Sequence, residues 1–220
     1  MKRRTLDILF SIGGLGIAAL LAIMGLVMTS NANFSQKYVT DQLAQQKITF
    51  KPAAALSEEE RQYACLVEHA GQPLLTGKQA ECYANHFIGL HVKNTAGGKT
   101  YAELGDVQTA LRAQIAEAQK VSDPELPALQ KQLADTIAQR ETVFKGETLR
   151  GVLLTSYGFS TLGEKADQAA TVAYLGAGLM LLLSLAGAIH AARTPKTKAF
   201  AAPQPPEVEV EVDERKLTTV

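Results

Sequence analysis

The sequence predicts an all-α membrane protein in which two transmembrane helices flank an exported helical bundle. Two long apolar runs lie near the ends of the chain, at 8–28 and 169–192, and the first is 21 residues without a charge. A helix of that length crosses a hydrocarbon core of about 30 Å. Between the two runs, apolar residues recur at spacings of three and four, which is typical of amphipathic helices.

Basic residues flank the apolar runs on the sides that face the two chain ends. Lys2, Arg3 and Arg4 precede the first run, and Arg193 follows the second. By the positive-inside rule both termini are cytoplasmic, and we expect a multi-pass protein of the plasma membrane with the lipid bilayer as a partner. The predicted parts are a cytoplasmic N-terminus (1–7), a transmembrane helix (8–28), an exported helical domain (29–168), a second transmembrane helix (169–192) and a disordered cytoplasmic tail (193–220).

The composition argues against a nucleic-acid partner. The chain has 22 basic and 22 acidic residues, and residues 29–168 carry 14 Lys or Arg against 16 Asp or Glu. This mild negative balance provides no basic patch for phosphates. The segment is long enough for one domain with its own core, since domains commonly have about 100–150 residues.

The first apolar run has a competing interpretation as a secretory signal peptide. Ser30, Asn31 and Ala32 place small residues at the −3 and −1 positions of a cleavage site after Ala32. Signal peptides usually have a shorter apolar core, of about 7–15 residues. We therefore predict a retained anchor.

Small residues repeat every fourth position in both apolar runs. At this spacing they let two helices approach closely in lipid. We expect the two transmembrane helices to pack along these faces, and a homo-oligomer through small-residue faces is an alternative use of them. The residues are Gly14, Ala18 and Ala22 in the first run and Ala169, Ala173 and Ala177 in the second.

Three capping-box patterns predict helix starts in the exported segment. They lie at Ser57 with Glu60, Thr76 with Gln79, and Thr100 with Glu103. The first run is expected to continue outward as an amphipathic helix, and 48–54 to form an extended link. The predicted helices cover 57–70, 76–90 and 100–118, and a further striped segment at 126–144 would pair with 100–118 as a coiled-coil-like antiparallel hairpin. The segment 146–163 is read either as interfacial or as buried core.

Two Cys–His pairs form the sharpest chemical constellation in the sequence. Cys65 and His69 are one helical turn apart, as are Cys82 and His86. If the two helices pack together, the four side chains form a structural zinc set. A Cys65–Cys82 disulfide uses the same packing and suits an oxidising compartment, so we favour it over unpaired thiols and over metal. We expect no catalytic residue and no cofactor.

Four short motifs resemble a family of small two-span bacterial membrane proteins of unestablished function. The motifs are SNANF (30–34), TGKQAE with YANHFIGLH (76–81 and 83–91), FKGETLRG (144–151) and LTSYGFS (154–160). The resemblance extends over most of the chain except the tail, and it implies the two-span topology only.

Members of this family sometimes carry the label aromatic ring-opening dioxygenase. A non-haem iron oxygenase needs two His and one carboxylate around an open iron face. His69, His86 and His91, with Glu68 and Glu81, supply these ligand types. No spacing among them selects such a triad, so we do not predict this activity.

The leading functional hypothesis is a non-enzymatic envelope scaffold or accessory subunit. It would bind another membrane or envelope protein through its exported helices or its tail, where 207–212 alternates valine and acid and is able to add to a partner's sheet edge. The alternatives are an extracytoplasmic sensor or ligand-binding module without its own transmitter domain, and a metal-binding enzyme.

Overall fold

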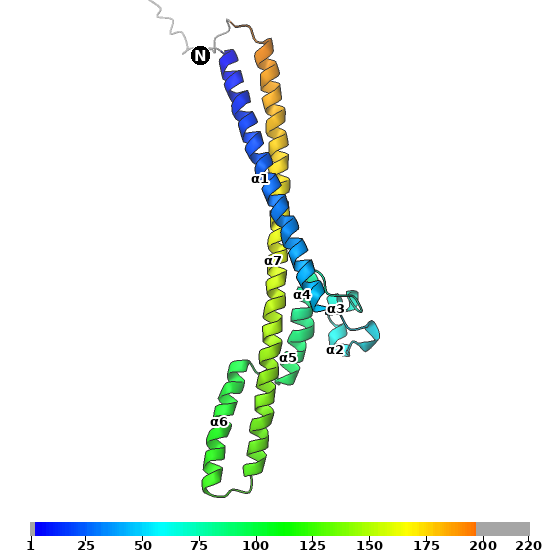
Figure 1. Ribbon diagram of the computed structural model, residues 1–220, viewed down its shortest axis with the longest axis vertical. Helices are drawn as coiled ribbons and strands as arrows, with labels where there is room; N and C mark the ends of the chain where they lie inside the picture. The colour runs from blue at the N-terminus through cyan, green and yellow to red at the C-terminus, as the bar shows by residue number, and fades with distance from the viewer. Residues whose placement is uncertain (1–2, 197–220) are drawn as a thin grey trace, which may run out of the picture. The chain divides into compact units, whose positions relative to one another are not determined.

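The computed structural model describes residues 3–196, and this part of the chain is all-helical, with an isolated bridge between Thr49 and Pro73 in place of any strand. The all-α prediction is therefore confirmed for these residues, whereas the predictions for 197–220 lie outside them. The elements in chain order are α1 (Arg3–Gln46), the 3₁₀-helix η1 (Ala53–Ala55), α2 (Glu58–Arg61), α3 (Ala64–Glu68), α4 (Gly77–Cys82), the π-helix η2 (Tyr83–Ile88), α5 (Gly89–Thr95), α6 (Tyr101–Lys120) and α7 (Leu126–Arg193) (Figure 1).

Helices α1 and α7 are long and apolar enough to cross a membrane, judged by length and composition. Helix α1 has 44 residues and ends at Gln46, which confirms that the first apolar run continues as a helix. The chain divides into two compact units. The described residues of unit 1 are 3–25 and 171–196, and unit 2 comprises 26–170.

Small residues form the contact between the two helices of unit 1. Gly14, Ala18 and Gly25 of α1 are buried, as are Ala173 and Ala177 of α7. A Cβ atom added at Gly25 would lie 2.6 Å from Cε1 of Tyr174, and one added at Gly14 would overlap Oγ of Ser184. These positions must therefore stay without a side chain for the helices to approach as they do.

The predicted small-residue face of α7 is right at Ala173 and Ala177 and wrong at Ala169. Ala169 is exposed, and Ala170 is buried in its place. In this part of α7 the buried positions are Ala170, Ala173 and Ala177, a step of three residues followed by one of four. Counting back four residues from Ala173 therefore leads to Ala169, which lies off the buried face of the helix.

A polar contact also links the two helices of unit 1. Nδ1 of His190 lies 2.9 Å from Oδ2 of Asp7. Oγ of Ser11 donates to the Asp7 carbonyl oxygen at 2.7 Å, and it would meet a Cβ atom added at Gly187. The amino-acid sequence gives no local signal for this pairing, since 183 positions separate His190 from Asp7.

Unit 2 has one hydrophobic core, to which α1, the short helices and α7 all contribute. Leu43, Leu66, Leu74, Leu104 and Leu153 are almost completely buried in it. Close approaches again occur at glycine, since a Cβ atom at Gly77 would overlap Ser160 and one at Gly146 would overlap Val92. Oγ of Ser35 donates to the Phe159 carbonyl oxygen at 2.6 Å and so joins α1 to α7 within this unit.

All three predicted capping boxes are present, but two of the predicted helices differ from the expectation. The segment 57–70 forms two short helices, because Tyr63 between them has an extended backbone with φ −96° and ψ 104°. The segment 76–90 contains the π-helix η2 between α4 and α5. Capping boxes fix where a helix begins and carry no information on its continuation.

The segment 146–163 is neither a separate interfacial segment nor fully buried. It is the middle of α7, which runs without interruption for 68 residues. Leu153 is fully buried on one side, while Val152, Phe159 and Leu162 are exposed on the other. The buried-core interpretation therefore fits one side of the helix, and the interfacial interpretation of the exposed side stays a prediction.

Helix α6 lies beside the first turns of α7, joined to it by the turn at 121–125 (Figure 1). The guanidinium of Arg140 donates to the Gln108 side chain at 2.9 Å and to the Tyr101 carbonyl oxygen at 3.2 Å. Oγ1 of Thr100 receives a hydrogen bond from the Glu103 amide and begins α6 with a complete capping box.

The glycine contacts of unit 1 give a prediction with a neighbouring control. Gly14→Leu should lower the thermal unfolding temperature of the detergent-solubilised protein by several degrees, because its side chain would displace Ser184 and cost about 1–3 kcal/mol. Gly13→Leu should leave the unfolding temperature nearly unchanged, since nothing lies within 4 Å of a Cβ atom at Gly13. Equal effects of the two substitutions would contradict this packing.

Candidate functional site

The structure brings Cys65 of α3 and Cys82 of α4 to disulfide-bonding distance. Their sulfur atoms are 1.99 Å apart and their Cα atoms 6.1 Å apart. The two cysteines are 17 positions apart in the sequence. The bond joins α3 to α4 across the turn that contains Gly71, whose φ of +74° favours glycine.

The two histidines of the alternative metal set do not converge on a common point with these sulfurs. The ring of His69 packs on Phe50 with centroids 5.5 Å apart, and the ring of His86 stacks on Tyr63 at 4.4 Å. Within residues 3–196, no group of three or more His, Cys, Asp or Glu side chains is placed to hold a metal ion.

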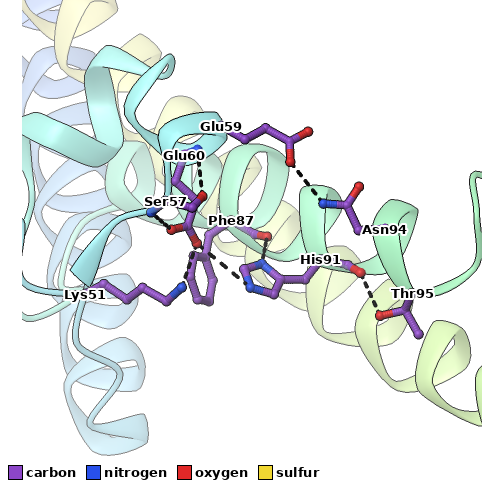
Figure 2. A network of polar contacts seen from close by, with 8 residues as sticks. All are labelled: Lys51, Ser57, Glu59, Glu60, Phe87, His91, Asn94 and Thr95. Atoms are coloured by element: carbon purple, nitrogen blue, oxygen red, sulfur yellow. Dashed lines mark hydrogen bonds and ion pairs between the residues drawn. The ribbon is translucent and has the colours of Figure 1, made fainter.

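Among the buried polar side chains of the described residues, Glu60 is the charged one, and the sequence predicts it only as a capping residue. Its side chain is 1% exposed. One carboxylate oxygen accepts from Nζ of Lys51 at 2.8 Å, and the other accepts from the Ser57 amide at 2.7 Å (Figure 2). A single carboxylate thus caps α2 and holds the segment before it.

His91 of α5 approaches the same carboxylate from a different element. Its Nε2 atom is 3.8 Å from Oε1 of Glu60, and its Nδ1 atom donates to the Phe87 carbonyl oxygen at 2.8 Å (Figure 2). A carbonyl only accepts, so this hydrogen bond places the proton of a neutral His91 on Nδ1. Protonation of Nε2 would turn the contact with Glu60 into an ion pair.

The π-helix η2 places an aromatic group beside this network. Tyr83 and Phe87 have ring centroids 4.6 Å apart, and Phe87 lies 4.5 Å from the ring of His91. Nζ of Lys51 is 5.0 Å from the Phe87 ring centroid, a cation–π distance. A π-helix adds a residue to a turn, which changes the faces that the following side chains occupy, and such turns are frequent at functional sites.

Burial and hydrogen bonding shift the pKa of Glu60 in opposite directions. Burial alone raises the pKa of its carboxyl group, but the hydrogen bonds and charge of Lys51 and the hydrogen bonds of Ser57 outweigh it and lower the pKa below the ordinary 4.5. Burial raises the pKa of Tyr83, and the negative charge of Glu60 adds to this shift. The network therefore stabilises an ionised Glu60 beside a neutral Tyr83 at neutral pH.

A second candidate site lies on α6 and α7, where a cavity of about 350 Å³ opens between them. Arg140 is fixed at its edge, with the guanidinium 4.0 Å from the Tyr101 ring centroid and hydrogen-bonded to Gln108. We call this cavity the hairpin groove. Its lining residues are Tyr101, Gln108, Arg112, Ile137, Arg140, Glu141 and Phe144.

The sequence analysis assigned the residues of the hairpin groove only to helix stripes. Ile137 and Arg140 fall within the striped segment predicted at 126–144, and Phe144 is its last residue. In the structure Arg140 is half-buried, whereas Ile137 and Phe144 are exposed, at 39% and 56%. The exposure of two large apolar residues beside a fixed arginine is the signal that periodicity alone does not provide.

No protein-family model matches the chain, and the curated proteins and the solved structures also give no match. The resemblance to small two-span bacterial membrane proteins therefore stays a prediction.

The cysteine pair predicts a loss of stability on reduction. Closing a loop of this length contributes about 3 kcal/mol in the chain-entropy model. Reduction, or the double substitution Cys65→Ser with Cys82→Ser, should lower the free energy of unfolding of the full chain in detergent by this amount. Urea titration followed by helical circular dichroism measures the change. Equal unfolding midpoints with and without reductant would contradict a disulfide.

The lowered pKa of Glu60 predicts a specific acid sensitivity. A group whose pKa is lower in the folded than in the unfolded chain stabilises the fold above its unfolded value, and this contribution is lost as the pH falls through the folded pKa. Stability should therefore fall from near pH 4.5 downward. Glu60→Gln should flatten this decline and lower stability at pH 7 by about 1–3 kcal/mol.

The matched control is Glu58→Gln, a substitution in the same helix at an exposed position. Urea titrations between pH 3 and pH 7 should give the control the profile of the unmodified chain. A Glu60→Gln variant that retained the full acid-induced decline would contradict the assigned role of this carboxylate.

Proposed function

We propose that the protein is a non-enzymatic two-pass membrane protein that acts as an accessory subunit in the cell envelope. Its exported helices would bind another envelope protein, with the hairpin groove as the contact site. Two apolar helices that are able to cross a membrane support the insertion. The basic residues at 2–4 and at 193–198 support cytoplasmic termini, since such residues are retained on the cytoplasmic side.

The single observation that carries the proposal is the composition of the hairpin groove. Tyrosine, phenylalanine and arginine are enriched in protein interfaces, and aromatic and Arg anchors dominate their binding energy. Here Tyr101 and Phe144 are exposed, and their ring centroids are 5.8 Å apart. An apolar side chain of a partner would lie between these rings and Ile137.

The fixed position of Arg140 adds to this argument. Its guanidinium is already held by Tyr101 and Gln108, so partner binding requires little further ordering of this side chain. Side chains that are ordered only on binding cost about 0.5–1.5 kcal/mol each. Arg112 and Glu141 place one charge of each sign at the same groove, which suits a partner segment with mixed polar groups around an apolar residue.

The buried polar groups of unit 2 support a structural role for Glu60. Its carboxylate is engaged by Lys51 and by Ser57, which is the arrangement of a capped helix held by an ion pair. The Cys65–Cys82 pair fits the same picture, because disulfides persist in the oxidising compartment outside the plasma membrane.

A second candidate function is an extracytoplasmic ligand-binding module. The volume of the hairpin groove, about 350 Å³, is within the range of small-molecule sites. The two functions differ in a thermal-shift experiment. A small molecule that raised the unfolding temperature of the unmodified chain but not that of a Phe144→Ala variant would favour the ligand-binding module.

Phe144→Ala should reduce recovery of the partner in affinity purification from native membranes by at least about tenfold, because truncating an anchor residue at an interface typically costs 2 kcal/mol or more. The fold should remain intact because Phe144 is 56% exposed. Quantitative mass spectrometry of the co-purified proteins measures the effect. The matched control is Val121→Ala, which truncates a 73% exposed residue outside the groove.

Labelling of intact cells tests the proposed topology, in which residues 29–168 lie outside the cytoplasm. In a Cys82→Ser variant, Cys65 has a free thiol, and an impermeant maleimide should label it in intact cells. A chain that reacts only after lysis would place residues 29–168 in the cytoplasm and would refute the proposal. Repeated purification of the unmodified chain without any partner would refute the accessory role.

A further inference from the structure

Two cavities lie between α1 and α7 in unit 1, where the two helices run side by side (Figure 1). The larger has a volume of about 680 Å³ and the smaller one of about 230 Å³. Both are lined by Ser11, Ile12 and Ala188, so they adjoin each other, and we call them together the span groove. Arg4 lines only the smaller part, and the larger part is lined by Leu15, Leu181, Leu182 and Leu185.

The smaller part of the span groove contains a cation without a protein partner. Arg4 is half-buried there, whereas Arg3 beside it is exposed. Within residues 3–196, no ion pair or hydrogen bond engages the Arg4 guanidinium. The carboxylate of Asp7, one turn further along α1, lies 2.9 Å from His190 instead. A guanidinium that is partly withdrawn from water and lacks an acidic partner favours an anion from outside the chain.

The larger part of the span groove offers apolar contacts. Its leucines are all exposed, and the hydroxyls of its two serines are turned elsewhere. Oγ of Ser11 donates to the Asp7 carbonyl oxygen at 2.7 Å. Oγ of Ser184 is buried against Gly14 of α1. The groove therefore combines a cationic end with a hydrocarbon surface, which matches a molecule with an anionic head and an alkyl chain.

The position of the span groove along α1 matches one leaflet of a bilayer. Arg4 lies four residues before the apolar run at 8–28, about 6 Å of helix, and the headgroup layer is about 5–8 Å thick. Leu15 lies seven residues after Ile8, about 10 Å of helix, within the roughly 15 Å of hydrocarbon in one leaflet. A lipid of this leaflet would have its phosphate level with Arg4 and its acyl chain level with Leu15.

A third transmembrane helix suits the span groove less well than an acyl chain does. Helices in lipid associate through small residues that bring their backbones close together. In unit 1, Gly14 and Gly25 already serve the contact between α1 and α7. The exposed leucines of the groove would keep another backbone at a distance, whereas a flexible acyl chain follows their irregular surface. A helix in hydrocarbon would also leave the charge of Arg4 unpaired.

We propose that the span groove binds one anionic phospholipid, with its phosphate on Arg4 and one acyl chain along Leu15 and Leu185. The inference rests on the membrane insertion proposed above and goes beyond the accessory function, since it assigns a ligand to unit 1. Basic pockets between transmembrane helices bind anionic headgroups, and anionic lipids give the cytoplasmic leaflet its negative surface potential. In the proposed topology, Arg4 lies at that leaflet.

Native mass spectrometry of the full-length protein in detergent tests the role of charge. Dioleoyl phosphatidylglycerol should bind more tightly than dioleoyl phosphatidylcholine, which differs from it only in the headgroup. Arg4→Ala should lower the affinity for phosphatidylglycerol by about fivefold, the effect of one basic residue near an anionic lipid. The matched control is Arg3→Ala, which removes the same charge outside the groove and should leave the affinity nearly unchanged. Equal affinities for the two lipids, or equal effects of the two substitutions, would overturn the proposal.

A second substitution blocks the acyl chain and leaves the charge in place. Ala188→Phe would fill the groove where its two parts meet and should weaken phosphatidylglycerol binding by at least about tenfold, the loss expected when about two methylene groups stay unburied. Ala186→Phe makes the same change at an exposed position outside the groove and should retain the lipid. Unfolding temperatures confirm that the variants are folded. Unchanged binding by Ala188→Phe, or displacement of the lipid by glycerol phosphate, which has no acyl chain, would count against the site.

Photo-cross-linking in the native membrane identifies the occupant of the span groove. A photoreactive amino acid in place of Leu15 should give an adduct with a phospholipid, which mass spectrometry of the purified protein detects. A cross-link to another protein or to a second copy of the chain would show a helix in the groove and would refute lipid binding there.

The lipid measurements are separate from those on the accessory function. Native mass spectrometry uses the purified chain, so a failure to recover any partner would refute the accessory role and leave the lipid affinities unaffected. If maleimide labelling placed residues 29–168 in the cytoplasm, the groove would face the opposite leaflet with the same Arg4 and the same leucines. Loss of headgroup preference with normal partner recovery would refute the lipid site alone.

Discussion

The structure depends on close packing of α1 against α7 at positions where one of the two helices has almost no side chain. In unit 1 these positions are Gly14 and Gly25, beside Ser184 and Tyr174. In unit 2, Gly163 lies beside Ser35, and a Cβ atom added there would be 2.9 Å from the Cβ of Ser35. Glycine allows backbones to approach so closely that dispersion contacts along both helices become favourable.

Unit 2 combines this helix pair with a short-helix segment that is too small to build a core alone. Residues 47–96 contain no α-helix longer than seven residues, and their buried apolar side chains share one core with residues of α1, α6 and α7. Two local devices hold the segment in place. The Cys65–Cys82 pair joins α3 to α4, and the Glu60 carboxylate links Lys51 to the start of α2.

The burial of Glu60 has a physical cost that the structure offsets locally. A carboxylate removed from water is stable only when its oxygens are hydrogen-bonded and its charge is paired. Lys51 and Ser57 provide both, and His91 stands 3.8 Å away as a further titratable neighbour. Removing either partner would leave the buried Glu60 carboxylate without part of this compensation, which is costly.

The sequence alone determined the helical class, the two apolar helices and all three helix starts, because length, periodicity and capping act through neighbouring residues. It also favoured a Cys65–Cys82 disulfide over unpaired thiols and over a metal site. Only the tertiary structure decided that 57–70 breaks at Tyr63, that η2 is a π-helix, and that Ala170 rather than Ala169 is buried. It likewise decided which side of 146–163 is exposed. Each of these depends on contacts between residues far apart in the chain, and local patterns carry no information on such contacts.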